Sequence, residues 1–203
     1  MEDLVRHLEL RGLLKNKSVR DAFLAVDRAD FVPERAKKMA YVDHPLSIGE
    51  GQTISQPLVV AFMLEALQPK EGDKIMDVGV GSGWQTGLLA KIVGDKGKID
   101  AIEVIPQLLQ QAQNNLSKYN FKNIKFFNQN ARGGLPQLAP FDGIIAGASG
   151  EKIPQAWKDQ LKIGGRIVAP VGNSVIFVMK KSKDKFEERE CPGFIFVPLV
   201  DGD

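Results

Sequence analysis

Apolar residues follow a helical spacing in the first part of the chain. Up to about residue 45, apolar positions recur every three or four residues, as in Val19, Phe23 and Val26. This spacing places the three side chains on one face of a helix, with Ser18 predicted as the N-cap residue. We therefore expect an N-terminal helical extension.

From Lys74 onward the pattern changes to short apolar runs that alternate with amphipathic segments. The apolar runs are residues 74–81, 98–104, 124–129, 141–149 and 164–172, and the predicted helices are 84–94, 105–119 and 154–162. In the second helix, Leu108, Ala112 and Leu116 form a stripe that can pack on a sheet. Strands that alternate with helices are typical of βαβ units around a parallel sheet.

The C-terminal part has a third pattern. Two apolar runs, 175–181 and 194–200, flank the polar stretch 182–193, which predicts an antiparallel addition to the sheet. The predicted fold class is therefore α/β: a mostly parallel sheet flanked by helices, with an N-terminal helical extension and antiparallel strands at the end. A length of 203 residues favours one domain over 1–203, divided into an extension over 1–57 and an α/β core over 58–203.

Composition narrows the partners and the compartment. Lysine and arginine number 27 against 25 acidic residues, so the net charge of +2 does not indicate a nucleic-acid partner. No apolar run approaches the roughly 20 residues that span a bilayer, so we expect no membrane association. The single Cys191 and a charged N-terminus predict a cytoplasmic protein. We also expect a monomer. His7 and His44 have no ligand-spaced partner, so we expect no metal.

The clearest local motif is a glycine-rich turn between a predicted strand and a predicted helix. It reads Asp77-Val-Gly79-Val-Gly81-Ser-Gly83, and Glu103 follows about 20 residues later at the end of the next strand. Glycine lets the backbone turn sharply and lets a ligand approach it closely. An acid after the second strand can bind ribose hydroxyls. Together these residues predict a nucleoside site.

The spacing of the glycines separates two kinds of nucleoside cofactor. A dinucleotide-binding G-x-G-x-x-G motif needs a glycine at Trp84 or at Thr86, and neither position has one. The G-x-G-x-G turn instead resembles the first motif of class I methyltransferases, so its predicted cofactor is S-adenosyl-L-methionine. A turn that serves packing alone remains the structural alternative.

A second segment resembles one methyltransferase family. Residues 49–57 read Gly49-Glu-Gly-Gln-Thr-Ile-Ser55-Gln-Pro57, which is similar to the G-x-G-Q-T-I-S-Q-P stretch of protein-L-isoaspartate O-methyltransferases. From the residues alone, Ser55 is predicted to cap the following helix, with Pro57 in its first turn. The resemblance adds a second role, because it implies that Ser55 lies at the active site as the catalytic residue. Thr53, Ile54, Ser55 and Gln56 are the predicted substrate-binding residues.

The similarity extends over almost the whole chain. Residues 139–149, 153–172 and 194–200 each resemble the corresponding family segments in the same order. The resemblance implies transfer of a methyl group from S-adenosyl-L-methionine to the α-carboxylate of L-isoaspartyl residues in damaged proteins and peptides, which initiates repair. The alternatives are a class I methyltransferase with a different acceptor and a non-catalytic relative that binds the cofactor.

One stretch departs from the family pattern. Where members usually read Gly-Asp-Gly after the third strand, this chain reads Gln129-Asn130-Ala131. The resemblance places this stretch beside the adenine, so the neutral Asn130 amide predicts weaker cofactor binding than an acid would give. The predicted cofactor-binding residues are Asp77, Gly79, Gly81, Ser82, Gly83, Glu103, Val104, Asn130 and Ala131.

Overall fold

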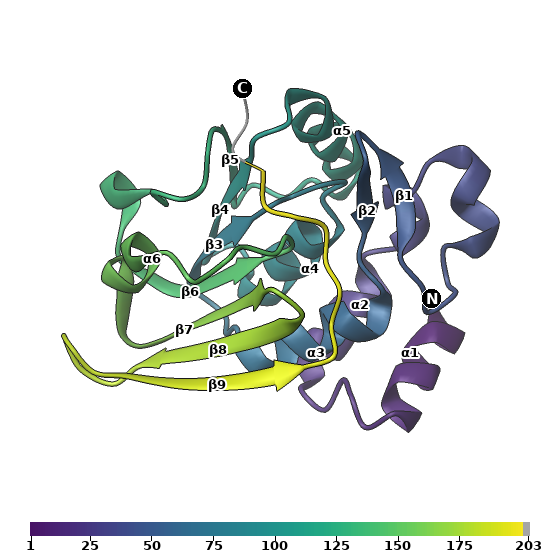
Figure 1. The fold of residues 1–203 in the computed structure, drawn as a ribbon. Helices are drawn as coiled ribbons and strands as arrows, with labels where there is room; N and C mark the ends of the chain where they lie inside the picture. The colour runs from purple at the N-terminus through teal and green to yellow at the C-terminus, as the bar shows by residue number, and fades with distance from the viewer. Residues whose placement is uncertain (201–203) are drawn as a thin grey trace.

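The computed structural model of the protein describes residues 1–200, so the last three residues of the predicted domain lie outside it. The N-terminal region is helical, as predicted, and a small antiparallel hairpin follows these helices in the sequence (Figure 1). Its elements are α1 (Glu2–Leu10), α2 (Lys17–Ala25), the 3-10 helices η1 (Arg28–Phe31) and η2 (Glu34–Met39), and the hairpin strands β1 (Leu46–Gly49) and β2 (Gln52–Ile54).

The main sheet has seven strands in the order β5-β4-β3-β6-β7-β8-β9. The strands are β3 (Lys74–Val78), β4 (Lys98–Glu103), β5 (Ile124–Asn128), β6 (Phe141–Ala146), β7 (Leu161–Val171), β8 (Ser174–Lys180) and β9 (Phe186–Pro192). The first five are parallel, and β8 and β9 are antiparallel to their neighbours. The predicted α/β fold with an antiparallel C-terminal addition is therefore confirmed.

Helices precede and connect the parallel strands. They are α3 (Pro57–Leu67), α4 (Trp84–Val93), α5 (Pro106–Leu116) and α6 (Gln155–Asp159), with the 3-10 helices η3 (Ser117–Tyr119) and η4 (Pro136–Leu138). Consecutive residues of a strand face opposite sides of the sheet. Ile75 packs into the cluster that holds the buried faces of α1 to α5, whereas Met76 and Val78 pack with Trp157 of α6. The N-terminal helices thus share a core with one face of the sheet.

The strand order changes direction at β3. From β3 the chain moves outward to β4 and β5, and then returns to β6 and β7 on the other side. At such a switch point the loops that follow the neighbouring strands diverge and leave a crevice at the carboxyl ends of the strands. The fold therefore places the loops after β3, β4 and β6 around one opening.

Two predicted N-caps are wrong. Helix α2 is capped by Asn16, whose side-chain oxygen accepts a hydrogen bond from the Ser18 backbone N–H at 3.0 Å. Helix α3 has Gln56 at its N-cap position, so Ser55 lies one residue too early to serve as the cap. In each case a serine was predicted as the N-cap because serine is favoured at that position, but the helix begins at a different residue.

Only one of the two apolar runs forms a strand of the antiparallel C-terminal addition. The partner of β8 is the polar stretch 186–192, not the apolar run 194–200. Edge strands commonly carry charged residues, and β9 holds Glu187, Glu188 and Arg189 at the end of the sheet. Residues 194–200 leave the sheet and run back toward the carboxyl ends of the parallel strands, where Pro198 forms an isolated bridge with Ser149 (Figure 1).

Candidate active site

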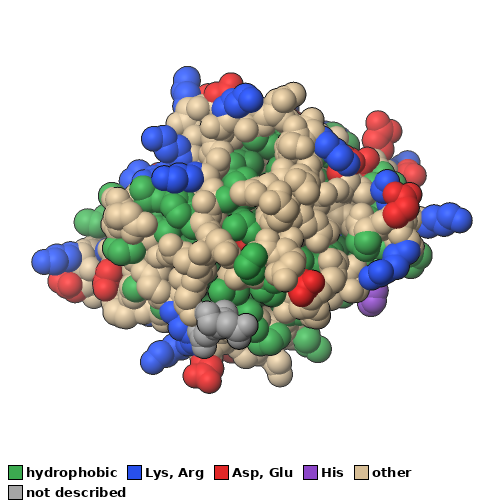
Figure 2. All heavy atoms as spheres, turned by 90° about the horizontal axis from the view of Figure 1, so that it is seen from above, with side chains coloured by type: hydrophobic (Ala, Val, Ile, Leu, Met, Phe, Trp, Pro, Cys, Tyr) green, Lys and Arg blue, Asp and Glu red, His purple; other side chains and the backbone are tan. Residues whose placement is uncertain are grey.

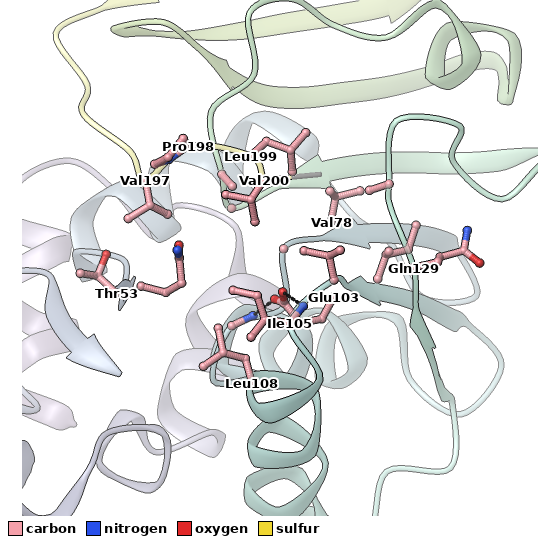
Figure 3. Close-up of a pocket in the computed structure, with 18 residues that line it drawn as sticks. Thr53, Val78, Glu103, Ile105, Leu108, Gln129, Val197, Pro198, Leu199 and Val200 are labelled. Carbon is pink, nitrogen blue, oxygen red and sulfur yellow. Dashed lines mark hydrogen bonds between the residues drawn. The ribbon is translucent and has the colours of Figure 1, made fainter. Parts of the chain in front are cut away.

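A pocket lies at the crevice between the diverging strands. Its wall includes Val78 and Gly79 at the end of β3, Glu103 and Val104 at the end of β4, and Ala148 after β6. Figure 3 shows Ile105 and Leu108 on one side of the cavity and the C-terminal residues on another. Seen from above the view of Figure 1, hydrophobic side chains gather in the middle of the surface, with charged side chains around the margin (Figure 2).

The glycine turn, residues 79–83, forms part of the pocket wall. Gly79, Gly81 and Gly83 have φ angles of +75°, +56° and +95°, which side-chain-bearing residues rarely adopt. Gly79 and Gly81 line the pocket. A Cβ at Gly83 would instead meet Ala112 and Leu116 of α5 at 3.0–3.3 Å, so this glycine allows two helices to approach each other. The motif therefore combines a ligand surface with a packing contact.

Glu103 joins the glycine turn to the loop after β4. Its Oε2 accepts a hydrogen bond from the Gly81 backbone N–H at 2.8 Å, and its Oε1 accepts one from Ile105 at 3.0 Å (Figure 3). A carboxylate has about four acceptor positions, so both oxygens can accept further hydrogen bonds from a diol. Among the pocket-lining residues within 1–200, Glu103 is the only one with an ionisable side chain.

Asp77 lies behind the turn and does not line the pocket. It is fully buried, and its two oxygens accept hydrogen bonds from the Thr86 hydroxyl at 2.6 Å and the Gln85 amide at 2.8 Å. Burial raises the pKa of Asp77 to about 6, because removing a carboxylate from water disfavours its charged form. In this position Asp77 links β3 to the first turn of α4.

Of three other predicted cofactor residues, two line the pocket and one does not. Val104 and Ala131 line the pocket, whereas Ser82 is buried outside it and accepts a hydrogen bond from Asn115 through its backbone carbonyl. Ala131 is held by Trp157, whose indole N–H donates to the Ala131 carbonyl at 2.8 Å.

The stretch after β5 contributes to the pocket through the neighbours of Asn130. Gln129 and Ala131 line the pocket and Asn130 does not. The Asn130 side-chain oxygen accepts a hydrogen bond from the Arg132 backbone N–H at 2.8 Å. Gln129 directs its amide away from the centre of the cavity and donates to the Gly134 carbonyl at 3.3 Å (Figure 3). The adenine contact of Asn130 stays a prediction.

The segment 49–57, called here the 49–57 loop, borders the same pocket. Gln52 and Thr53 line it, and Figure 3 shows Thr53 facing the C-terminal residues across the opening. Ile54 is buried in the core, and Ser55 is half-buried just beyond the lining residues. The Ser55 hydroxyl has no hydrogen-bond partner within residues 1–200, so it is not committed to a structural contact.

Gln56 and the start of α3 are held by an acid that sequence reasoning missed. Asp43 Oδ1 accepts a hydrogen bond from the Leu58 backbone N–H at 2.8 Å, and Oδ2 accepts one from the Gln56 amide at 3.1 Å. Asp43 thus provides the side-chain cap that was predicted for Ser55. No local pattern identifies this contact, because the two partners are separated by a loop and a hairpin.

The C-terminal residues 197–200 also line the pocket and were not predicted there. The Ser149 backbone N–H donates to the Val197 carbonyl at 2.8 Å, and the Leu199 N–H donates to the Ser149 carbonyl at 2.8 Å. The proline within this apolar run was the available signal, since proline is rare inside paired strands.

The residues present fit a nucleoside ligand. The glycine turn leaves its backbone open to the cavity, Glu103 places an acid where ribose hydroxyls are bound in this kind of fold, and Val78 and Leu108 supply apolar surface. The fold and site therefore define a nucleoside-binding α/β protein of the Rossmann-like methyltransferase type.

The chain belongs to the protein-L-isoaspartate(D-aspartate) O-methyltransferase family, whose model matches residues 1–203. It is 41% identical over 202 residues to a protein-L-isoaspartate O-methyltransferase of Methanococcus aeolicus, covering 98% of this chain and 94% of the relative. A relative of the same name from Ignicoccus hospitalis is 38% identical over 203 residues, covering 98% of this chain and 96% of that protein.

Solved structures give the same grouping. A Plasmodium falciparum chain assigned to this family, in complex with S-adenosyl-L-homocysteine, has a TM-score of 0.88 and 25% identity, covering 98% of this chain and 97% of that chain. The predicted family and fold are therefore confirmed.

Proposed function

We propose that the protein is an S-adenosyl-L-methionine-dependent protein carboxyl O-methyltransferase that methylates the α-carboxylate of L-isoaspartyl residues in damaged proteins and peptides. One observation carries the proposal: the glycine turn and Glu103 share a pocket with Gln52 and Thr53 of the 49–57 loop. Family membership over 1–203 and the names of the relatives support the same activity.

The cofactor would be held by the glycine turn and by Glu103. Gly79 and Gly81 would contact it through their backbone, and the Glu103 carboxylate would accept hydrogen bonds from the ribose hydroxyls. S-adenosyl-L-methionine supplies an electrophilic methyl group on a sulfonium sulfur and leaves as S-adenosyl-L-homocysteine.

The 49–57 loop would bind the isoaspartyl group. A carboxylate is ionised near neutral pH, so the substrate oxygen needs no base to become a nucleophile. The lining of the pocket supports a mechanism without a general base. Glu103 is its one ionisable side chain within 1–200, and the Glu103 carboxylate already accepts two backbone hydrogen bonds. Ser55 would donate its hydroxyl to the substrate, and Thr53 would contact the adjoining peptide.

Catalysis would then depend on alignment and on exclusion of water. The attacking oxygen must lie in line with the transferred methyl group, and correct placement of two reactants contributes several kcal/mol. Val197, Leu199 and Val200 present apolar side chains to the pocket from the side opposite Leu108 (Figure 3). These side chains would keep water from the reacting atoms.

We also propose that the described residues act as one domain in a cytoplasmic monomer. The buried faces of α1 and α2 lie in the same hydrophobic cluster as sheet residues such as Ile75, which supports one cooperative unit. Across residues 1–200, no helix has the length and apolar character required to cross a membrane.

The test is a methyl-transfer assay with matched peptides. The protein is incubated with radiolabelled S-adenosyl-L-methionine and peptides that differ only in L-isoaspartate or normal aspartate, and base-labile methyl ester is counted. We expect label only in the isoaspartyl peptide. Label in another acceptor would favour a different class I methyltransferase. Binding of S-adenosyl-L-homocysteine by calorimetry without any transfer would favour a non-catalytic relative.

A further inference from the structure

Arg28 is a buried cation that donates to the backbone of two separate loops. Its guanidinium donates through Nη1 to the Ala40 carbonyl at 2.7 Å and through Nη2 to the His44 carbonyl at 2.9 Å. Nη2 also donates to the Ser55 carbonyl at 3.1 Å. Arg28 therefore connects the turn at 40–44 directly to the 49–57 loop.

The free-energy cost of burying a cation at this position is substantial. Arg28 is fully buried, its Nε has no partner within residues 1–200, and burial lowers its pKa to about 10. Burying a charge is costly unless it is paired, and apolar residues of similar volume often replace buried ions without loss of stability. An apolar side chain cannot bind carbonyl groups. A planar guanidinium has five N–H donors and can bind several carbonyl groups at once.

Asp43 gives the 49–57 loop a second attachment. It belongs to the same turn that Arg28 holds, and its carboxylate accepts hydrogen bonds from the Gln56 side chain and the Leu58 backbone. Ser55 is therefore held from two sides. Arg28 donates a hydrogen bond to the Ser55 carbonyl, and Asp43 accepts one from the side chain of the next residue, Gln56. The two contacts leave the Ser55 hydroxyl uncommitted.

Arg28 also contacts the residue that follows the glycine turn. Its guanidinium carbon lies 5.4 Å from the centre of the Trp84 ring, and Trp84 is the first residue of α4, directly after the glycine turn. Trp84 is itself fixed, because its indole N–H donates to the Val26 carbonyl at 3.2 Å. Arg28 thus contacts both an anchor of the glycine turn and the 49–57 loop.

From these contacts we propose that Arg28 and Asp43 are positioning residues for the transfer reaction, which set the place of the 49–57 loop relative to the glycine turn. This inference rests on the proposed function, since it concerns the alignment of an isoaspartyl substrate with the methyl donor. Neither residue lines the pocket, so each acts through the backbone and side chains that it holds.

Asp43 offers the sharper test. Asp43→Ala removes both acceptors, whereas Asp43→Asn keeps an oxygen for the Leu58 N–H, and the Gln56 amide can turn to pair with the new amide. Asp21→Ala is the matched control, because Asp21 is an exposed acid of α2 that pairs with Lys17. Arg28→Met and the control Arg20→Met form a second pair, with Arg20 in an exposed ion pair with Glu9.

Each variant is measured well below its thermal unfolding midpoint in two assays, methylation of the isoaspartyl peptide and calorimetric binding of S-adenosyl-L-homocysteine. For Asp43→Ala we expect kcat/KM for the peptide to fall about 10- to 100-fold, as for reactants displaced by an ångström or less. Product affinity should stay within about 2-fold, and Asp43→Asn should recover most of the loss, since it restores a hydrogen bond of ordinary strength. Both controls should behave as the parent protein.

Unchanged peptide kinetics in both Asp43→Ala and Arg28→Met, even with a lower unfolding midpoint, would show that the two residues serve stability alone and would overturn the inference. Equal losses in Asp43→Asn and Asp43→Ala would overturn it as well. A parent protein that methylates no isoaspartyl peptide would instead contradict the proposed function itself, and the inference with it.

Discussion

The glycine turn and the 49–57 loop border one pocket but are held in place by different kinds of contact. The glycine turn follows β3 directly, and its position is fixed by the parallel pairing of β3 with β4 and β6 and by Glu103. The 49–57 loop is attached to no strand of the main sheet. It is held by long-range side-chain contacts from Arg28 and Asp43.

This difference matches the two tasks of the site. A cofactor of constant shape suits a surface built from backbone at the end of a rigid sheet, as in other nucleoside-binding folds. A damaged residue occurs in many protein contexts, so its binding loop has to be placed accurately without being part of the sheet. Substitutions on the two sides should therefore have different consequences: fold and cofactor affinity on one side, substrate turnover on the other.

The largest effect is expected at Gly83. In Gly83→Val the new side chain would meet Ala112 and Leu116 of α5, and the residue would have to keep a φ of +95°. Strain and overpacking together should lower the free energy of unfolding by about 2–5 kcal/mol. Urea denaturation measures this. The control is Gly172→Ala, where φ is also positive but no atom lies within 4 Å of the new Cβ. Equal losses in both variants would show that contact with α5 is unimportant.

The next effect concerns cofactor affinity. Glu103→Ala removes the acceptor for the ribose hydroxyls and for the backbone N–H groups of Gly81 and Ile105. Loss of a hydrogen bond to a charged acceptor costs about 1.5–3 kcal/mol, so the affinity for S-adenosyl-L-homocysteine should fall by about 10- to 150-fold. Calorimetry gives the value, and circular dichroism checks that the fold is retained. An unchanged affinity in a folded variant would contradict the ribose assignment.

A pH-dependent effect is expected at Asp77. Burial raises its pKa from 3.8 to about 6, so between these values the folded protein binds more protons than the unfolded chain. The contribution of Asp77 to stability is thus present below about pH 4 and is lost as the pH rises through 6. Asp77→Asn cannot lose a proton, so its stability relative to the parent should increase over this range by on the order of 2 kcal/mol. Urea unfolding at pH 4 to 7 measures it, and a constant difference would argue against the raised pKa.

The smallest effect on stability is expected at Ser55. Because Asp43 caps α3, Ser55→Ala removes no cap, and the Ser55 carbonyl that Arg28 binds is retained. The free energy of unfolding should change by less than about 0.5 kcal/mol, as at a surface position that makes no cap, packing or buried hydrogen-bond contact. Turnover of the isoaspartyl peptide should nevertheless fall, while the affinity for S-adenosyl-L-homocysteine stays the same. Turnover at the parental rate would remove Ser55 from the substrate site.

The difference between the glycine turn and the 49–57 loop also explains which parts of the fold and the site could be predicted from the sequence. The parallel sheet and the glycine turn follow from local patterns, because a buried strand, a turn without side chains and an amphipathic helix each leave a short-range signal. The end of β4 at Glu103 was predicted from the extent of an apolar run. These features need no knowledge of which distant residues come together.

The contacts that place the 49–57 loop leave no such signal. Ser55 and Arg28 are 27 residues apart, and Asp43 is 15 residues from Leu58. A buried arginine in a polar stretch looks like a surface residue in the sequence, and an acid in a turn looks like a solvated one. The place of the apolar run 194–200 was missed for a related reason, since its residues 197–200 line the pocket and none of the run pairs with β8.

The most direct test of the proposed function follows the fate of an isoaspartyl peptide. A methyl ester next to an isoaspartyl linkage is expected to close to a succinimide, which reopens in part as normal aspartate. The peptide is incubated with the protein with and without S-adenosyl-L-methionine, and the isoaspartyl and aspartyl forms are separated by chromatography. We predict that the aspartyl form accumulates only when the methyl donor is present. An isoaspartyl fraction that is the same with and without the donor would contradict the proposed repair function.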